Sequence, residues 1–189
     1  MAFVKQRIFG LMLMVLAAFS LLSPTPSLAV NKNTLNVNAL AALATLYTNE
    51  PKAKILGKKS AGILVFPNIV QSGLVVGGSG GFAGDGVLYN KKSKALGYYN
   101  SATHSVSHQS DTKTFSYAVF FMSDAAMKKF QKSKDWEIGT ALNLALVDAR
   151  IGKNLDTKTL KSEVYVLIFN QKGLTSSLGF KGQKITTIK

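Results

Sequence analysis

Short apolar runs separated by glycine, proline and polar residues make up most of the chain from residue 60 onwards. The runs Ile63–Phe66, Leu74–Val76 and Val87–Tyr89 are rich in β-branched and aliphatic residues, which is typical of buried strands rather than of helix. Pro67-Asn68 predicts a turn between the first two runs. A bend with six glycines, at positions 77, 78, 80, 81, 84 and 86, separates the second run from the third. Such glycines are expected where the backbone needs positive φ or is approached closely.

Runs of the same kind continue to the end of the chain. They predict further strands at Ala95–Ser101, Phe115–Met122, Ile138–Val147, Val164–Phe169, Leu174–Phe180 and Ile185–Ile188. Tight turns are expected at Asn90–Lys94, Asn170–Gly173 and Lys181–Gly182. Phe115–Met122 is the strongest apolar run of this part of the chain, and its aromatic and β-branched content favours a central position in a sheet.

Helical spacing is found in three places. Residues 35–47 place on one helical face Val37, Leu40, Ala44 and Tyr47, with Leu43 and Leu46 beside them. Pro51 suits the first turn of a short helix that Gly57 would stop. Ser123-Asp124 is a capping sequence for a helix with Ala126, Met127 and Phe130 on its buried face.

The helix at residues 35–47 has two interpretations, packing on a sheet or lying on a membrane. It contains no charged residue, whereas a typical interfacial helix has a strongly basic polar face. Packing on a sheet is therefore favoured. The whole pattern predicts an α+β fold, with a largely antiparallel β-sheet or partial barrel of eight or nine short strands, an N-terminal helix and one further helix after Met122. Residues 30–189 are expected to form a single domain.

Residues 1–29 have the order of a secretory signal peptide. Lys5 and Arg7 precede an apolar run from Ile8 to Leu22, and Ser27-Leu28-Ala29 has small residues at the two positions that a signal peptidase reads. The run is shorter than the about 20 residues of a spanning helix, and an uncleaved anchor is the alternative. Because the chain has no cysteine, a lipid-anchored lipoprotein is excluded. We expect an exported protein that is periplasmic, envelope-associated or secreted.

The chain is strongly basic. Its 189 residues include 23 Lys and Arg and 9 Asp and Glu, for a net charge of +14. Loss of Lys5 and Arg7 with the signal peptide would leave 21 basic residues and a charge of +12. Such an excess attracts polyanions, and export makes nucleic acid the least suitable of them. The expected partners are anionic lipid or a membrane surface, and other envelope proteins; a basic protein that is merely soluble is the alternative.

The sequence shows no established catalytic or cofactor motif. Residues 78–83 approach a dinucleotide-binding glycine motif, but a strand pattern follows where a helix N-terminus would hold the pyrophosphate. His104, His108 and Asp111 are the one group from which a metal site or a hydrolase could be built, and surface histidines are the favoured interpretation. Nucleophile elbows and paired carboxylates do not occur. We therefore expect a non-enzymatic protein without metal or cofactor.

Lysines are gathered in four groups. They are Lys52, Lys54, Lys58 and Lys59; Lys91, Lys92 and Lys94; Lys128, Lys129, Lys132 and Lys134; and Lys172, Lys181, Lys184 and Lys189. A single lysine run is usually a solvated face, but four runs against so few acids predict at least one strongly positive face. Each lysine close to anionic lipid contributes about 1 kcal/mol to binding.

A series of segments carries a resemblance that extends over nearly all of residues 30–189. The segments are Lys54–Pro67, Gly73–Gly78, Gly84–Leu88, Gly97–Tyr99, Tyr117–Met122, Trp136–Gly139, Phe169–Leu174 and Lys184–Thr186. In this order they resemble the SYLF-domain family, also described as lipid-binding SYLF proteins. Eukaryotic members of that family bind phosphoinositide membranes and some bind actin, and bacterial members are typically exported.

The resemblance implies affinity for lipid, with the identity of the lipid left open. By position it implies membrane-facing candidates on the first helix and on the lysines after it: Leu40, Leu43, Tyr47, Lys52, Lys54, Lys58 and Lys59. The chain departs from the family in having no basic residue on that helix and in a segment 104–113 with less glycine and alanine. We expect an exported, non-enzymatic lipid-binding domain that associates with anionic lipid or envelope surfaces through basic residues and an apolar element. The alternative is a structural or protein-binding envelope module with no direct lipid contact.

Overall fold

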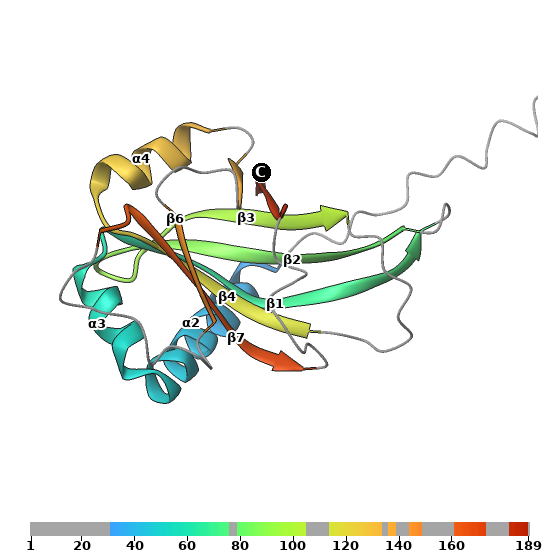
Figure 1. Cartoon of the computed structure of the whole chain (residues 1–189), viewed down its shortest axis with the longest axis horizontal. Helices are drawn as coiled ribbons and strands as arrows, with labels where there is room; N and C mark the ends of the chain where they lie inside the picture. The colour runs from blue at the N-terminus through green and yellow to red at the C-terminus, as the bar shows by residue number, and fades with distance from the viewer. Residues whose placement is uncertain are drawn as a thin grey trace, which may run out of the picture. The chain divides into compact units, whose positions relative to one another are not determined.

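One β-sheet and three helices make up the part of the chain that the structure, a computed structural model, describes: residues 31–75, 79–104, 114–133, 136–138, 144–148, 161–172 and 182–188 (Figure 1). The helices are α2 (Lys32–Asn49), α3 (Pro51–Lys59) and α4 (Asp124–Lys132). Within these residues, no helix is both long enough and apolar enough to cross a membrane.

The sheet has eight strands and curls into a half-barrel. The strands are β1 (Gly62–Val75), β2 (Ser79–Asn90), β3 (Ala95–His104), β4 (Thr114–Phe121), β5 (Trp136–Glu137), β6 (Leu144–Asp148), β7 (Val164–Lys172) and β8 (Lys184–Ile188). Their order is β5-β8-β3-β2-β1-β4-β7-β6, and every neighbouring pair is antiparallel except β6 and β7. The expected α+β fold with a largely antiparallel partial barrel is confirmed. Two helices, α2 and the short helix expected from Pro51, precede the sheet.

Strand β1 runs through Pro67 and Asn68, so the turn expected there is wrong. The pairing of β1 with β4 shifts register between Phe66 and Ile69, and its pairing with β2 shifts between Val65 and Val70. Proline has no N–H to offer a ladder, and a bulge is the place inside a sheet where none is needed. The Ser116 hydroxyl donates a hydrogen bond of 2.6 Å to the Pro67 carbonyl oxygen. Two expected short strands are thus one long bulged strand.

Glycines of β2 lie against this bulge. A Cβ atom at Gly84 would collide with the Asn68 carbonyl oxygen, and one at Gly86 would lie 2.7 Å from the Val65 carbonyl oxygen and 2.6 Å from Cδ1 of Phe66. Gly80 to Gly86 therefore belong to a strand and not to the expected bend. The expectation of close backbone approach is confirmed at these two positions, where the bulged strand leaves no room for a side chain.

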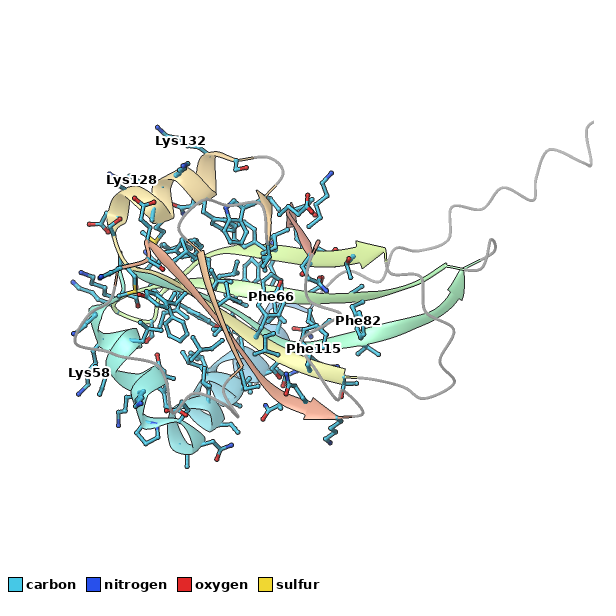
Figure 2. All side chains as sticks on the ribbon, viewed as in Figure 1. Lys58, Phe66, Phe82, Phe115, Lys128 and Lys132 are labelled. Atoms are coloured by element: carbon cyan, nitrogen blue, oxygen red, sulfur yellow. The ribbon has the colours of Figure 1, made fainter. Side chains whose placement is uncertain are left out.

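The inner face of the sheet carries the aromatic core. Phe66 stacks on Tyr117 with ring centroids 4.5 Å apart, and Phe82 meets Phe115 edge-on at 5.3 Å (Figure 2). Strand β4 is buried along nearly its whole length and lies between β1 and β7, which confirms the central position expected of it.

Helix α4 closes one end of this core. Ser123 accepts a hydrogen bond from the Ala126 N–H and caps the helix. Ala126, Met127 and Phe130 are buried as expected, and the Phe130 ring lies 5.4 Å from that of Trp136. The outward side of α4 carries Lys128, Lys129 and Lys132, all exposed.

The later strands differ in detail from the expectations. Strand β7 continues to Lys172 with Asn170 at a φ of 53°, so the turn expected to start at Asn170 is wrong; a register shift between β4 and β7 absorbs the irregularity. Ile138, expected to begin a strand, lies in a turn after β5, and β6 covers the end of that expected strand; residues 139–143 lie outside the described residues. The turn at Gly182 is confirmed by its φ of 83°. The strand expected at Leu174–Phe180 lies outside the described residues.

A buried polar chain crosses the inner face. The Tyr117 hydroxyl donates to Oγ of Ser101 at 2.6 Å, and Ser101 donates to Oε1 of Gln183 at 2.7 Å. Burial raises the pKa of Tyr117 well above its ordinary value, and the hydrogen bond with Ser101 opposes this only in part. Since an unfolded tyrosine ionises near pH 10, the folded state keeps this proton where the unfolded state releases it. The contribution of the protonated Tyr117 side chain to stability is therefore complete below about pH 10 and is lost as the pH rises.

Replacement of Tyr117 by Phe is expected to lower the free energy of unfolding by about 1 kcal/mol at neutral pH, because one buried hydrogen bond is lost. Above about pH 10 the stability of the variant should fall less steeply than that of the wild type, by up to about 1.4 kcal/mol per pH unit. Urea unfolding between pH 8 and pH 11 measures both effects. Equal slopes in the two proteins would contradict the pKa assignment.

Replacement of Gly86 by Ala is expected to destabilise the fold by about 1–3 kcal/mol or more, because backbone must move to admit the methyl group. Gly97→Ala is the matched control in the neighbouring strand. Its Cβ would approach only the Tyr99 ring, at 3.2 Å, which can shift. If both variants lost the same stability in urea unfolding, the loss would come from the strand propensity of the new residue and not from the contact of Gly86 with β1.

Candidate functional site

Helix α2 buries a different face from the one expected. Asn31 caps it by accepting hydrogen bonds from the N–H groups of Asn33 and Thr34. The buried residues are Leu35, Ala39, Ala42 and Leu46. Val37 is 67% exposed and Leu40 is 42% exposed, so the predicted apolar face, which also includes Ala44, points largely to solvent. The helix is apolar on more than one side, and the small side chains of Ala39 and Ala42 let its backbone lie close to the sheet.

Packing of α2 on the sheet is confirmed, against β1 and β2. Asn36 is the polar anchor of this contact. Its side-chain amide donates to the Tyr98 hydroxyl at 2.8 Å, and its Oδ1 atom accepts from the Tyr89 hydroxyl at 3.1 Å. Asn36 thus ties α2 to β2 and β3 at once and fixes where the outer face of the helix lies.

Helix α3 follows α2 with only Glu50 between them. Glu50 caps α3 by accepting from the Lys52 N–H, and Pro51 begins the helix as expected. The helix continues to Lys59, so the expected stop at Gly57 is wrong. Gly57 lies under the Tyr47 ring instead: a Cβ atom there would collide with the Tyr47 hydroxyl and lie 2.9 Å from Cζ of the same ring, so the ring would have to move.

A groove of about 230 Å³ lies between α2, α3 and the turn that joins β2 to β3. The residues of its lining that matter most are Leu40, Leu43, Tyr47, Lys54, Lys58 and Lys91. Five of the seven candidate lipid-contacting residues therefore meet in one place. Lys52 and Lys59, from the same helix, are not part of the lining.

The groove is electrostatically one-sided. Three of its lining residues are lysines and none is an aspartate or glutamate. Lys54, Lys58 and Lys91 are exposed, and they come from two lysine groups separated by more than 30 positions. In Figure 2, Lys58 on α3 is well apart from Lys128 and Lys132 on α4. Of the four lysine groups, the structure thus brings two together beside the groove.

Burial raises the pKa of both tyrosines in the lining of the groove. It raises the pKa of Tyr47 to about 12, and burial together with the neighbouring Tyr98 raises the pKa of Tyr89 to about 12. Both are therefore neutral phenols at pH 7. The Tyr89 hydroxyl is engaged by Asn36, whereas the Tyr47 hydroxyl has no hydrogen-bond partner within the described part of the chain.

The exposed apolar side chains lie on α2, α3 and the start of β3. Among the side chains that the structure describes, the large hydrophobic ones that are exposed are Val37, Leu40, Ile55 and Leu96. Val37 and Leu40 lie on α2 and Ile55 on α3, while Leu96 follows the β2–β3 turn. We call the groove and these four residues the groove face. It combines apolar contact area with uncompensated positive charge.

Sequence reasoning missed Lys91 and Ile55. Lys91 was recognised as part of a turn, and only the hairpin formed by β2 and β3 brings it to α3. Ile55 is exposed because α3 buries Ala53 and Leu56 instead.

The histidine group is not tested by the structure. His104 ends β3, while His108 and Asp111 lie outside the described residues.

A second cavity, of about 480 Å³, lies at the bulged ends of β1, β4 and β7 and is lined by residues such as Thr114, Ser116 and Gln171. It contains no histidine or carboxylate.

Comparison of the chain with known protein families and with curated proteins found no match. The resemblance to the SYLF-domain family therefore stays a prediction that rests on the segments quoted above.

Replacement of Asn36 by Ala is expected to lower the free energy of unfolding by about 1–3 kcal/mol, because the hydroxyls of Tyr89 and Tyr98 lose their partner. Asn33→Ala, a change of the same kind on the exposed first turn of α2, is the control and should cost no more than about 0.5 kcal/mol. Thermal unfolding and near-ultraviolet circular dichroism of the tyrosines measure the difference. Equal stabilities would mean that Asn36 does not anchor the helix.

Proposed function

We propose that this protein is an exported, non-enzymatic domain that binds anionic lipid or envelope surfaces through the groove face. The observation that carries the proposal is that three of the four exposed large hydrophobic residues among the described side chains lie on α2 and α3, the helices that frame the groove with its three lysines. Neither property alone would favour a membrane. Together they fit peripheral association, in which apolar residues enter the interface and basic residues attract the headgroups.

Helix α2 has a single basic residue, Lys32 at its first position, so most of the positive charge must come from other elements. Its outer face supplies Val37 and Leu40, and the charge comes from Lys54 and Lys58 on α3 and from Lys91 on the hairpin turn. A membrane surface would thus meet a composite of two helices and a turn. The lysine contribution, at about 1 kcal/mol each, is comparable to what burial of one or two of these apolar side chains provides.

Export rests on the residues at the start of the chain. A basic start, an apolar run and small residues before Val30 are the order of a signal peptide. An exported domain would meet lipid at the periplasmic or outer surface of the envelope. The lack of cysteine is compatible with this, since packing alone holds the domain together.

Neutralisation of the groove lysines is expected to weaken vesicle binding. The variant Lys54→Gln/Lys58→Gln/Lys91→Gln should lose about tenfold or more in affinity for vesicles of phosphatidylcholine with 30% phosphatidylglycerol, from the lost lysine attraction. The matched control, Lys128→Gln/Lys129→Gln/Lys132→Gln, removes the same charge from α4 and should lose no more than about twofold to threefold. Co-sedimentation at about 50 mM and at about 300 mM salt measures both, and binding should weaken at the higher salt.

Three results would count against the proposal. No sedimentation of the wild type with anionic vesicles at low salt would end it. Equal losses in the two triple variants would mean that net charge, and not the groove face, attracts the surface. Retained binding in the variant Val37→Ser/Leu40→Ser, whose substitutions fall on exposed positions, would remove the apolar part of the proposal.

A further inference from the structure

We infer that the groove is a site for one phosphate monoester, the terminal phosphate of an anionic lipid headgroup, held by Lys54, Lys58 and Lys91 with the Tyr47 hydroxyl as a fourth donor. The inference rests on the proposed function and goes further by naming the chemical group and the residues that select it. It distinguishes a defined headgroup site from general attraction between a basic face and any anionic surface.

Charge is the first argument. Lys54 and Lys58 are four residues apart on α3, and like charges at this spacing destabilise a helix. Lys91 adds a third cation to the same lining, which contains no carboxylate. Three ammonium groups match a phosphate monoester, which carries about −1.5 to −2 at pH 7, better than they match a phosphodiester with a single charge.

The hydroxyl of Tyr47 is a further hydrogen-bond donor in the lining of the groove. The ring lies across Gly57, where a Cβ atom would collide with its hydroxyl. The Tyr47 hydroxyl, whose pKa burial raises to about 12, is protonated at pH 7 as any tyrosine hydroxyl is, so it can donate. Without a partner among the described residues, it is a donor that a phosphate oxygen would satisfy.

Size decides which part of a lipid the groove can take. Its volume of about 230 Å³ is below the range of about 300–1,000 Å³ typical of sites that enclose a whole small molecule. A phosphate and the first atoms of glycerol are a suitable occupant, whereas acyl chains are not. Leu40 and Leu43 form the apolar part of the lining, and the acyl chains would stay in the bilayer that Val37 and Ile55 contact.

The test compares two vesicle compositions of matched surface potential, phosphatidylcholine with phosphatidic acid and phosphatidylcholine with phosphatidylglycerol. The first presents a phosphate monoester and the second only phosphodiesters. The wild type is expected to bind phosphatidic acid vesicles about fivefold to tenfold more tightly. Tyr47→Phe should reduce the ratio of the two affinities at least threefold, because it removes the hydroxyl that donates to the monoester and keeps the charge of the protein.

Gly57→Ala is the second variant, and it leaves the charge of the protein unchanged. The new methyl group must displace the Tyr47 ring, so the preference for phosphatidic acid should fall as in Tyr47→Phe. Thermal unfolding checks that both variants are folded, and the α4 triple-lysine variant should keep the wild-type preference. A preference retained in both Tyr47→Phe and Gly57→Ala would overturn the role of Tyr47.

Soluble probes separate this inference from the proposed function. Glycerol 3-phosphate should shift the amide resonances of Tyr47, Lys58 and Lys91, and dimethyl phosphate at the same concentration should shift them much less. Vesicle binding without preference and without these shifts would overturn the headgroup site and leave the proposed function intact. Shifts with glycerol 3-phosphate but no binding to any vesicle would end the proposed function and identify a site for a free phosphate monoester.

Discussion

The central strands of the sheet bury side chains on both of their faces, and the rest of the fold depends on covering both. On β1, Leu64 and Phe66 point to the inner face while Val65 points to the outer one, and all three are fully buried. The curl of the sheet, its aromatic side chains and α4 cover the inner face. The outer face cannot cover itself, so it needs α2 and α3. With no cysteine in the chain, packing supplies this cohesion without any covalent cross-link.

The way in which α2 covers the sheet produces the groove face. A helix lies closest to a sheet where its side chains are small, and α2 turns Ala39 and Ala42 inward. Val37 and Leu40 then remain at the surface, where Leu40 lines the groove with residues of α3 and the β2–β3 turn. Val37 and Leu40 therefore add nothing to the core, and they are the residues of α2 that the proposed lipid contact would use.

Local patterns predicted the elements well, and contacts between distant segments decided where the predictions failed. The central strand β4, the capped helix α4 and the turn at Gly182 follow from composition and capping, which act within a few residues. Pro67 indicated a turn because proline lacks the N–H that a strand needs for pairing. In the structure, β1 pairs with β2 and β4 on both sides of Pro67, so the chain forms a bulge there instead of a turn. The buried face of α2 could not be read from periodicity, since an apolar helix offers several faces. Five groove residues were predicted together; Lys91 was not, because hairpin pairing alone brings it there.

Glu50 has a mechanical consequence for the two helices that it joins. Its N–H donates to the Leu46 carbonyl oxygen at 2.8 Å and closes α2, while its own carbonyl oxygen accepts from the Ala53 N–H at 2.9 Å and opens α3. One residue thus serves both helix ends, and no free linker lies between them. The angle between α2 and α3 is therefore fixed by the backbone hydrogen bonds of a single residue in the folded state. An occupant of the groove would find its walls already in place, so little conformational entropy would be lost on binding.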